Sequence, residues 1–215
     1  MHMVINQHIA ISITIGLMTL VCFGCKKNGT SCNSTQAAYG FKVTSEWSPQ
    51  RVVYSIGDTI TLFSSFPKTL QNFLGTSSLI DFGNSTGIGG SHAFYELDSN
   101  QNIVKGALMK LEFFPVVGDV RPGVNVPDKQ KSISYQELPN AYQFKLKIVL
   151  RSKGIYAFFI SDLASSGING KNCTQAGFTN TVSNTDKNLN LFQYAMNRPP
   201  ASQFETERIF CFRVQ

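Results

Sequence analysis

The sequence predicts an all-β domain, an antiparallel β-sandwich with little helix. Short runs rich in β-branched and aromatic residues alternate with segments containing Gly, Pro and Asn, which is the pattern of strands and turns. The clearest run is Tyr142–Leu150, in which every second residue is large and apolar. That alternation is typical of a strand with one buried and one solvated face. Charged residues make up only 15% of the chain, so the composition favours a packed core over disorder.

The first expected strands lie around two turn signals. Phe41–Thr44 opens the domain, and the proline that comes two residues after Trp47 breaks this first segment. Arg51–Ile56 and Thr59–Phe63 are joined by the residue pair 57–58, Gly-Asp, which favours a turn. A Gly-Asp pair that leads into an alternating strand resembles the opening of many extracellular β-sandwich modules.

The rest of the chain predicts further strands and one helix. The strands are expected at Ala93–Leu97, Ile103–Phe114, Tyr142–Leu150, Ile155–Ile160 and Arg208–Val214. The fourth of these is apolar throughout, which predicts burial on both faces. Residues 169–190 are polar with little periodicity, whereas Leu189–Met196 is expected to form a short helix that ends before two prolines. Short strands separated by turn residues predict an immunoglobulin-like architecture, although the Cys-Trp-Cys spacing of antibody domains is absent.

The N-terminus differs from the rest and predicts an export signal. Ile9–Phe23 is a continuous apolar to weakly polar run, shorter than the roughly 20 residues that a membrane-spanning helix needs. Its length is typical of the apolar core of a signal peptide. Residues 26–40 are rich in Asn, Ser, Thr, Gly and Ala, which is typical of a flexible tether. We therefore expect a lipoprotein-type signal peptide at 1–24, a modified N-terminus and tether at 25–40, and a β-sandwich domain at 41–215.

A cysteine directly follows the apolar run. Residues 21–25 read Val-Cys-Phe-Gly-Cys, and Lys-Lys-Asn comes next. The segment resembles a bacterial lipobox of the looser Bacteroidota type, departing from the usual pattern in its Phe and in a Cys where Leu is commonest. The resemblance implies cleavage before Cys25 and a diacylglyceryl thioether on its sulfur, and two acyl chains hold a protein stably at a bilayer. An ordinary secretory signal with a coincidental cysteine, or an uncleaved anchor, is the alternative.

The lipobox resemblance also implies a place and a partner. A chain lipidated on Cys25 would be held at a bacterial membrane, which we expect to be the outer membrane, with its domain in the periplasm or at the cell surface. The formal net charge is +6, but the basic residues are scattered and form no dense cluster. A nucleic-acid partner is therefore not expected, whereas a glycan or another envelope protein is.

Five cysteines reduce to three if Cys22 is cleaved away and Cys25 is modified. In an oxidising compartment we expect Cys173 to pair with Cys211, and a bond through Cys32 is the main alternative. Closing a loop of roughly 40 residues stabilises a fold by about 4 kcal/mol in the chain-entropy model. No metal site is expected, because the mature chain has no Cys-x-x-Cys motif outside the anchor. No cofactor motif is present.

Candidate catalytic groups are few. His92 is the only histidine after the signal peptide, and it follows Ser91 in the Gly-rich stretch Thr86–His92. A mobile loop here would present Ser91 and His92 to a ligand, and an ordinary turn whose glycines adopt positive φ is the alternative. Adjacent residues of an extended segment point to opposite sides, which disfavours a direct nucleophile–base pair.

The acidic residues give no catalytic pair. They are spread singly along the chain, and those in or beside expected strands are Asp58, Asp81, Glu96, Asp98, Glu112, Asp119 and Asp162. A glycosidase needs two carboxyl groups at a defined separation, which the sequence does not select. Residues 58–60 resemble the Asp-Thr-aliphatic O-glycosylation motif of exported Bacteroidota proteins, which implies a sugar on Thr59, although Asp58 serves the turn equally well.

Two functional hypotheses result. The first is an envelope-anchored lipoprotein with a non-enzymatic binding or structural β-sandwich domain. Exposed aromatic residues within 41–66 and 189–197 are its expected ligand contacts, because the loops of a rigid sandwich commonly carry binding sites. The alternative is an exported hydrolase that acts on glycans through carboxylates not identified by the sequence.

Overall fold

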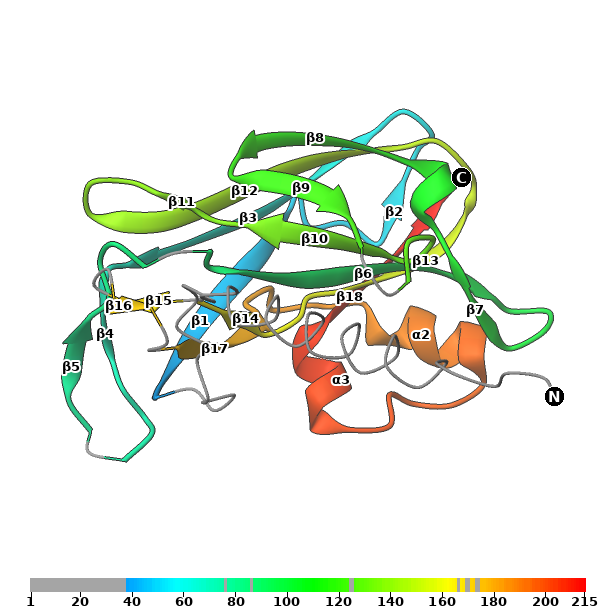
Figure 1. The fold of residues 1–215 in the computed structure, drawn as a ribbon. Coiled ribbons are helices and arrows are strands. Elements are labelled where there is room, and N and C mark those ends of the chain that lie inside the picture. Colours follow the sequence, from blue (N-terminus) through cyan, green and yellow to red (C-terminus); the bar gives the residue numbers. More distant parts are fainter. Residues whose placement is uncertain are drawn as a thin grey trace, which may run out of the picture. The chain divides into compact units, whose positions relative to one another are not determined.

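A computed structural model describes most of the domain, namely residues 38–75, 77–85, 87–123, 126–165, 167–168, 171–172 and 175–215. Two packed β layers form it (Figure 1). The layer that we call the β12 sheet contains β1 (Tyr39–Ser48), β3 (Thr59–Pro67), β8 (Leu111–Val117), β11 (Gln136–Glu137) and β12 (Ala141–Leu150). The layer that we call the β6 sheet contains β2 (Val53–Tyr54), β6 (Gly89–Asp98), β7 (Ile103–Gly106), β9 (Asp119–Pro122), β10 (Gln130–Ser134), β13 (Gly154–Phe159), β14 (Leu163–Ala164), β17 (Ala176–Val182) and β18 (Ile209–Val214).

Strand β1 belongs to both layers. Its residues 39–45 pair in parallel with β17, and its residues 46–48 pair antiparallel with β3. The β18 and β2 strands are also parallel, whereas the other strand pairs within the described residues are antiparallel. The predicted all-β sandwich is confirmed, but it is not antiparallel throughout as expected: its large sheet is mixed, because the β1–β17 and β18–β2 pairs are parallel.

The main core lies between the two sheets. On β12 the predicted alternation is confirmed, since Tyr142, Phe144, Leu146, Ile148 and Leu150 are buried. Aromatic rings from the two sheets meet in this core: the ring centroids of Trp47 and Phe158 lie 5.3 Å apart, and those of Phe66 and Phe178 lie 5.4 Å apart. Aromatic pairs at such distances stabilise a core beyond the apolar area that they bury.

Strand β13 is buried on both faces, as its apolar run predicts. Tyr156 and Phe158 face the main core. Ile155 and Ala157 face a second, smaller cluster beneath helix α2 (Leu189–Met196), which contributes Leu191, Phe192 and Ala195. The helix thus covers the outer side of the β6 sheet (Figure 1).

Several expected segments have other boundaries. The run Ile103–Phe114 is divided into β7, the 3-10 helix η1 (Leu108–Lys110) and β8, because the chain here crosses from the β6 sheet to the β12 sheet. Arg51–Ile56 shortens to the two residues of β2. The polar stretch 169–190 contains a true strand, β17, and a second helix, α3 (Gln203–Arg208), precedes β18.

Two small hairpins lie outside the layers. They are β4 (Thr69–Gln71) with β5 (Leu79–Asp81), and β15 (Gly167–Ile168) with β16 (Lys171–Asn172). Within the part of the chain that the structure describes, no helix has both the length and the apolar character needed to cross a membrane.

Candidate functional site

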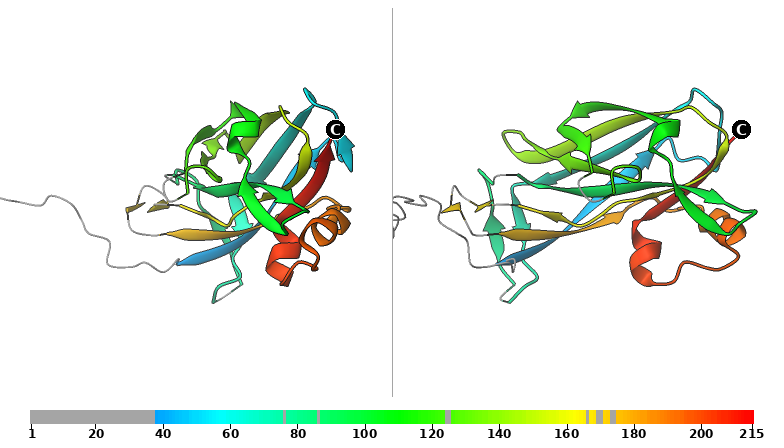
Figure 2. Two further views of the ribbon diagram at one scale, coloured as in Figure 1. Left: turned by 90° about the vertical axis from the view of Figure 1, so that its right-hand side faces the viewer. Right: turned by 45° about the vertical axis from the view of Figure 1, so that its right-hand side comes forward.

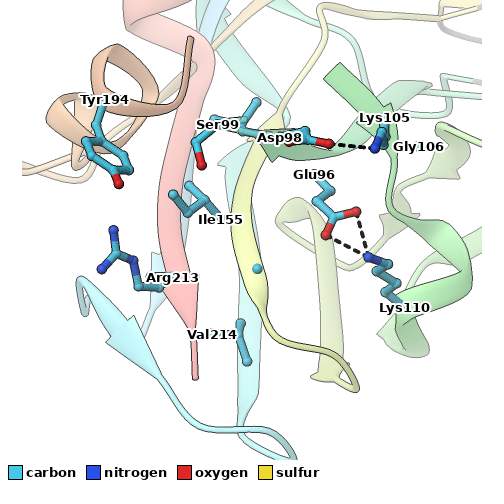
Figure 3. A pocket seen from close by; sticks show the side chains of 12 residues that line it. Glu96, Asp98, Ser99, Lys105, Gly106, Lys110, Ile155, Tyr194, Arg213 and Val214 are labelled. Carbon is cyan, nitrogen blue, oxygen red and sulfur yellow. Dashed lines mark hydrogen bonds and ion pairs between the residues drawn. The ribbon is translucent and has the colours of Figure 1, made fainter. Parts of the chain in front are cut away.

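A pocket of about 730 Å³ opens beside α2, where β6 and β18 end and β13 begins (Figure 3). We call it the charged pocket. Its charged and aromatic lining residues are Glu96, Asp98, Lys105, Lys110, Tyr194 and Arg213. Because these side chains come from five different elements, the pocket exists only in the folded domain.

Two ion pairs form one side of the charged pocket. Glu96 and Asp98 are two residues apart on β6 and therefore project from the same face of the strand. The Nζ atom of Lys110 lies 2.6 and 2.7 Å from the two carboxylate oxygens of Glu96, and Nζ of Lys105 lies 2.6 Å from Oδ2 of Asp98. At Gly154 a Cβ atom would come within 2.9 Å of Oε1 of Glu96, so this glycine leaves room for the carboxylate.

An aromatic and a guanidinium group form the other side (Figure 3). Helix α2 buries Leu191, Phe192 and Ala195, which leaves Tyr194 65% exposed. The Cζ atom of Arg213 lies 5.8 Å from the centroid of the Tyr194 ring, a favourable cation–π distance. Among the described residues, no carboxylate forms an ion pair with Arg213, so its charge is available to a ligand.

The electrostatics of this pocket disfavour Asp98 as a general acid. The Lys105 ammonium, and then the N–H group of Asn100, hold the pKa of Asp98 below its usual range. Asp98 in turn raises the pKa of Lys105. A glycosidase acid needs a raised pKa so that it carries a proton at neutral pH, and Asp98 shows the opposite shift. The two carboxylates are suited to accepting hydrogen bonds from hydroxyl groups.

A second pocket, of about 640 Å³, is more aromatic, and we call it the aromatic groove. The rings of Tyr95 and Phe159 meet edge to face in it at 5.7 Å. Arg198 lies with its Cζ atom 5.2 Å from the centroid of Phe192 and with Nη1 3.7 Å from Oε2 of Glu205. Arg198 therefore has a carboxylate partner, whereas Arg213 in the charged pocket pairs with none among the described residues.

The structure corrects the interpretation of Ser91 and His92. Both lie in strand β6 and not in a mobile loop, and they face opposite sides. Ser91 is exposed and lines the aromatic groove, whereas His92 is buried with its Nδ1 atom accepting the N–H group of Ser161 at 3.2 Å. Burial lowers the pKa of His92 to about 3, so the ring is neutral and does not contact a surface ligand.

The glycines beside this pair serve close packing. A Cβ atom at Gly89 would lie 2.2 Å from the carbonyl oxygen of Ile133, and one at Gly90 would lie 2.5 Å from that of Asp162. Larger residues would push the neighbouring segments away. Gly89 and Gly90 therefore reflect neighbouring backbone at β6, whereas Gly87 adopts a positive φ of 64°, as the alternative interpretation of a turn expects.

The predicted modification sites have different outcomes. Cys25 and Cys32 lie outside the described residues, as does Cys173. Cys211 is a free thiol buried beneath α2, so the structure does not show the predicted disulfide. Burial raises the pKa of this thiol and makes it unreactive in the native fold. Thr59 is the exposed first residue of β3, and its O-glycosylation stays a prediction.

The charged pocket was only partly visible in the sequence. Tyr194 lies in the segment 189–197 where ligand contacts were expected, and the i,i+2 spacing of Glu96 and Asp98 could have indicated a shared face. Lys105 could not be assigned, because its place depends on the pairing of β6 with β7. Arg213 comes from the last strand, and only the tertiary fold brings it beside α2. No group of acidic, His and Cys side chains suited to a metal ion occurs within the described residues.

Comparison with known proteins adds little to this geometry. No family model matches the chain, and no curated protein matches it. Among solved structures, the chain is similar to a cohesin module from a family 33 glycoside hydrolase of Clostridium perfringens ATCC13124. The two share 8% identity with a TM-score of 0.31, over 66% of this chain and 99% of the module. A likeness with so low a TM-score carries no argument about fold or ligand.

Proposed function

We propose that this chain is a bacterial envelope lipoprotein whose β-sandwich domain binds a glycan, without catalysis, in the charged pocket. The observation that carries the binding role is the arrangement of this pocket. An exposed tyrosine and an arginine that pairs with no carboxylate among the described residues lie on one side, and two lysine-held carboxylates lie on the other. This combination suits a ligand that has both apolar ring faces and many hydroxyl groups.

The chemistry of a sugar matches each side of the pocket. The C–H face of a pyranose ring is apolar and packs on an aromatic ring such as that of Tyr194. Sugar hydroxyl groups donate hydrogen bonds to the carboxylates of Glu96 and Asp98, and Arg213 donates to sugar oxygens or acidic substituents. Because each carboxylate is already held by a lysine, little side-chain entropy is lost when the ligand binds.

The anchor is the second part of the proposal. Residues 21–25 resemble a lipobox, and lipid on Cys25 would tether the domain at a bacterial membrane, with the outer membrane as the proposed location. The domain would then lie in the periplasm or at the cell surface. A glycan is a ligand present in both places, and a binding protein held there needs no reaction of its own.

The test is glycan binding by the mature lipoprotein, purified from membranes in detergent, on a broad glycan array and then by calorimetric titration. Tyr194→Ala should lower the affinity for the retained glycan by about tenfold or more, as removal of an aromatic contact commonly does. Phe114→Ala is the matched control, because Phe114 is also an exposed aromatic residue but lies on β8, in the other sheet.

Three outcomes count against the proposal. Equal affinities of the two variants would remove the charged pocket from the binding role, and a wild-type protein that retains no glycan would remove the ligand class. Release of a shortened glycan, lost on Glu96→Gln, would instead support the hydrolase alternative.

A further inference from the structure

The β4–β5 hairpin exposes apolar side chains at one end of the domain. Phe73 and Leu74 lie in its loop and are each close to half exposed, and Leu79 at the start of β5 is 69% exposed. The residues behind them are anchored, since Leu70 and Ile80 pack against the main core and Phe82 is fully buried. The hairpin therefore presents apolar groups to the surroundings from a firm base. Groups of exposed apolar residues commonly mark an interaction surface.

Specific contacts fix this hairpin to the beginning of β1. The N–H group of Phe73 donates to the carbonyl oxygen of Gly40 at 2.9 Å, and the N–H group of Gly40 donates to Oδ1 of Asn72 at 2.9 Å. A Cβ atom at Gly40 would lie 2.7 Å from Cγ of Leu74 and 2.9 Å from Cζ of Phe73. The apolar loop thus packs directly on the residue that follows Tyr39, the first residue of β1.

The position of the first residue of β1 indicates which partner the hairpin faces. β1 begins at Tyr39, at the end of the domain where the hairpin lies (Figures 1 and 2), and the segment after Cys25 precedes it in the sequence. Even fully extended, that segment spans only about 45 Å. We propose that the β4–β5 hairpin rests on the lipid bilayer that holds the anchor, an inference that depends on the lipid at Cys25 in the proposed function.

A lysine beside the apolar loop suits a phospholipid surface. Nζ of Lys42 lies 5.9 Å from the centroid of the Phe73 ring, which places a cation beside the apolar loop. Phe73, Leu74 and Leu79 enter the boundary between head groups and acyl chains, and the Lys42 ammonium meets phosphate groups. Asp81, the only acidic residue of residues 69–81, closes the base of the hairpin opposite Thr69. The hairpin and the acyl chains together act as two points of attachment.

The test places a fluorescent reporter on the hairpin. The mature lipoprotein is reconstituted into vesicles of phosphatidylethanolamine and phosphatidylglycerol, with or without bromine on the acyl chains, which quenches tryptophan by contact. The reporter variant is Leu79→Trp. The matched control is Ile103→Trp, on the hairpin that β7 forms with β6, where Ile103 is also exposed (41%). Trp47 is buried in the core and gives both variants the same background.

We expect the emission added by Leu79→Trp to fall at least about twofold in brominated vesicles, because apolar residues of an interfacial segment are buried roughly 5–10 Å into the boundary between head groups and acyl chains. Ile103→Trp should show no such loss. Equal quenching of both reporters, or none at residue 79, in a sample whose mass spectrum shows lipid on Cys25 would overturn the hairpin contact alone. A sample without lipid on Cys25 would overturn the anchor, and the hairpin contact with it.

Discussion

The two sheets of the domain differ in what covers their outer faces. Outside the β6 sheet, helix α2 packs on Ile155, Ala157 and Cys211 and closes a second apolar cluster. Outside the β12 sheet, the described residues include no such cover, and Lys147 and Phe114 are exposed. Strand β13 lies in the covered sheet and is apolar on both sides. Strand β12 lies in the uncovered sheet, and its residues alternate between buried and more exposed positions. Both pockets described above adjoin α2, so the covering helix also supplies pocket walls.

The largest effect is expected from a substitution that disrupts the packing of α2 on the β6 sheet. Phe192→Ala removes a ring that is 2% exposed, and we expect the free energy of unfolding to fall by about 3–4 kcal/mol because a cavity remains beneath α2. Phe114→Ala, which removes a ring that is 48% exposed on the other sheet, should cost less than about 1 kcal/mol. Chemical denaturation of both variants measures the difference. Similar losses would mean that α2 does not cover a packed surface.

A smaller effect, the pH dependence of stability, distinguishes the inward-facing side chains of β6 from the outward-facing ones. His92 has a pKa of about 3 in the fold and about 6.5 when unfolded, so the unfolded chain binds more protons between these values. The contribution of neutral His92 to stability is complete above pH 6.5 and is lost as the pH falls towards 3, by up to about 1.4 kcal/mol per pH unit.

The measurement is the free energy of unfolding between about pH 6.5 and pH 5.5, above the range where carboxyl groups titrate. His92→Phe should flatten the decline seen in the wild type. Ser91→Ala, which changes the outward neighbour, should leave the slope unchanged. A wild-type protein with no decline in this range would contradict the burial of His92.

The sequence predicted the strands in which each face is uniformly buried or uniformly exposed, and it predicted one helix. Strand β12 alternates because one face is exposed to solvent, and β13 is apolar because both faces are covered. Helix α2 ends at Met196, because the next residue, Asn197, adopts a left-handed conformation with φ of 50°. Strand β17 was missed because one of its buried positions is Asn180, which accepts a hydrogen bond from Oγ of Ser45 on β1. A buried polar residue whose hydrogen-bond partner lies on a distant strand has no local signature.

The site was less predictable than the fold for the same reason. Ser202 caps α3 by accepting from the N–H group of Glu205 at 3.2 Å, a local pattern that the sequence does contain. The charged pocket has no comparable pattern, because Arg213 and Tyr194 meet only through the docking of α2 on β18. The residue types visible in the sequence were sufficient for a β-sandwich, whereas the juxtaposition that suits a glycan required the tertiary structure.

The anchor on Cys25 supports both the proposed location and the hairpin contact, and the mass of the mature N-terminal peptide tests it most directly. The protein is purified from the membranes of a bacterium that produces the full-length chain, digested and analysed by mass spectrometry. The account predicts a peptide that begins at Cys25 and carries a diacylglyceryl group on its sulfur. A peptide that retains residues 1–24, or a Cys25 without lipid, would contradict it.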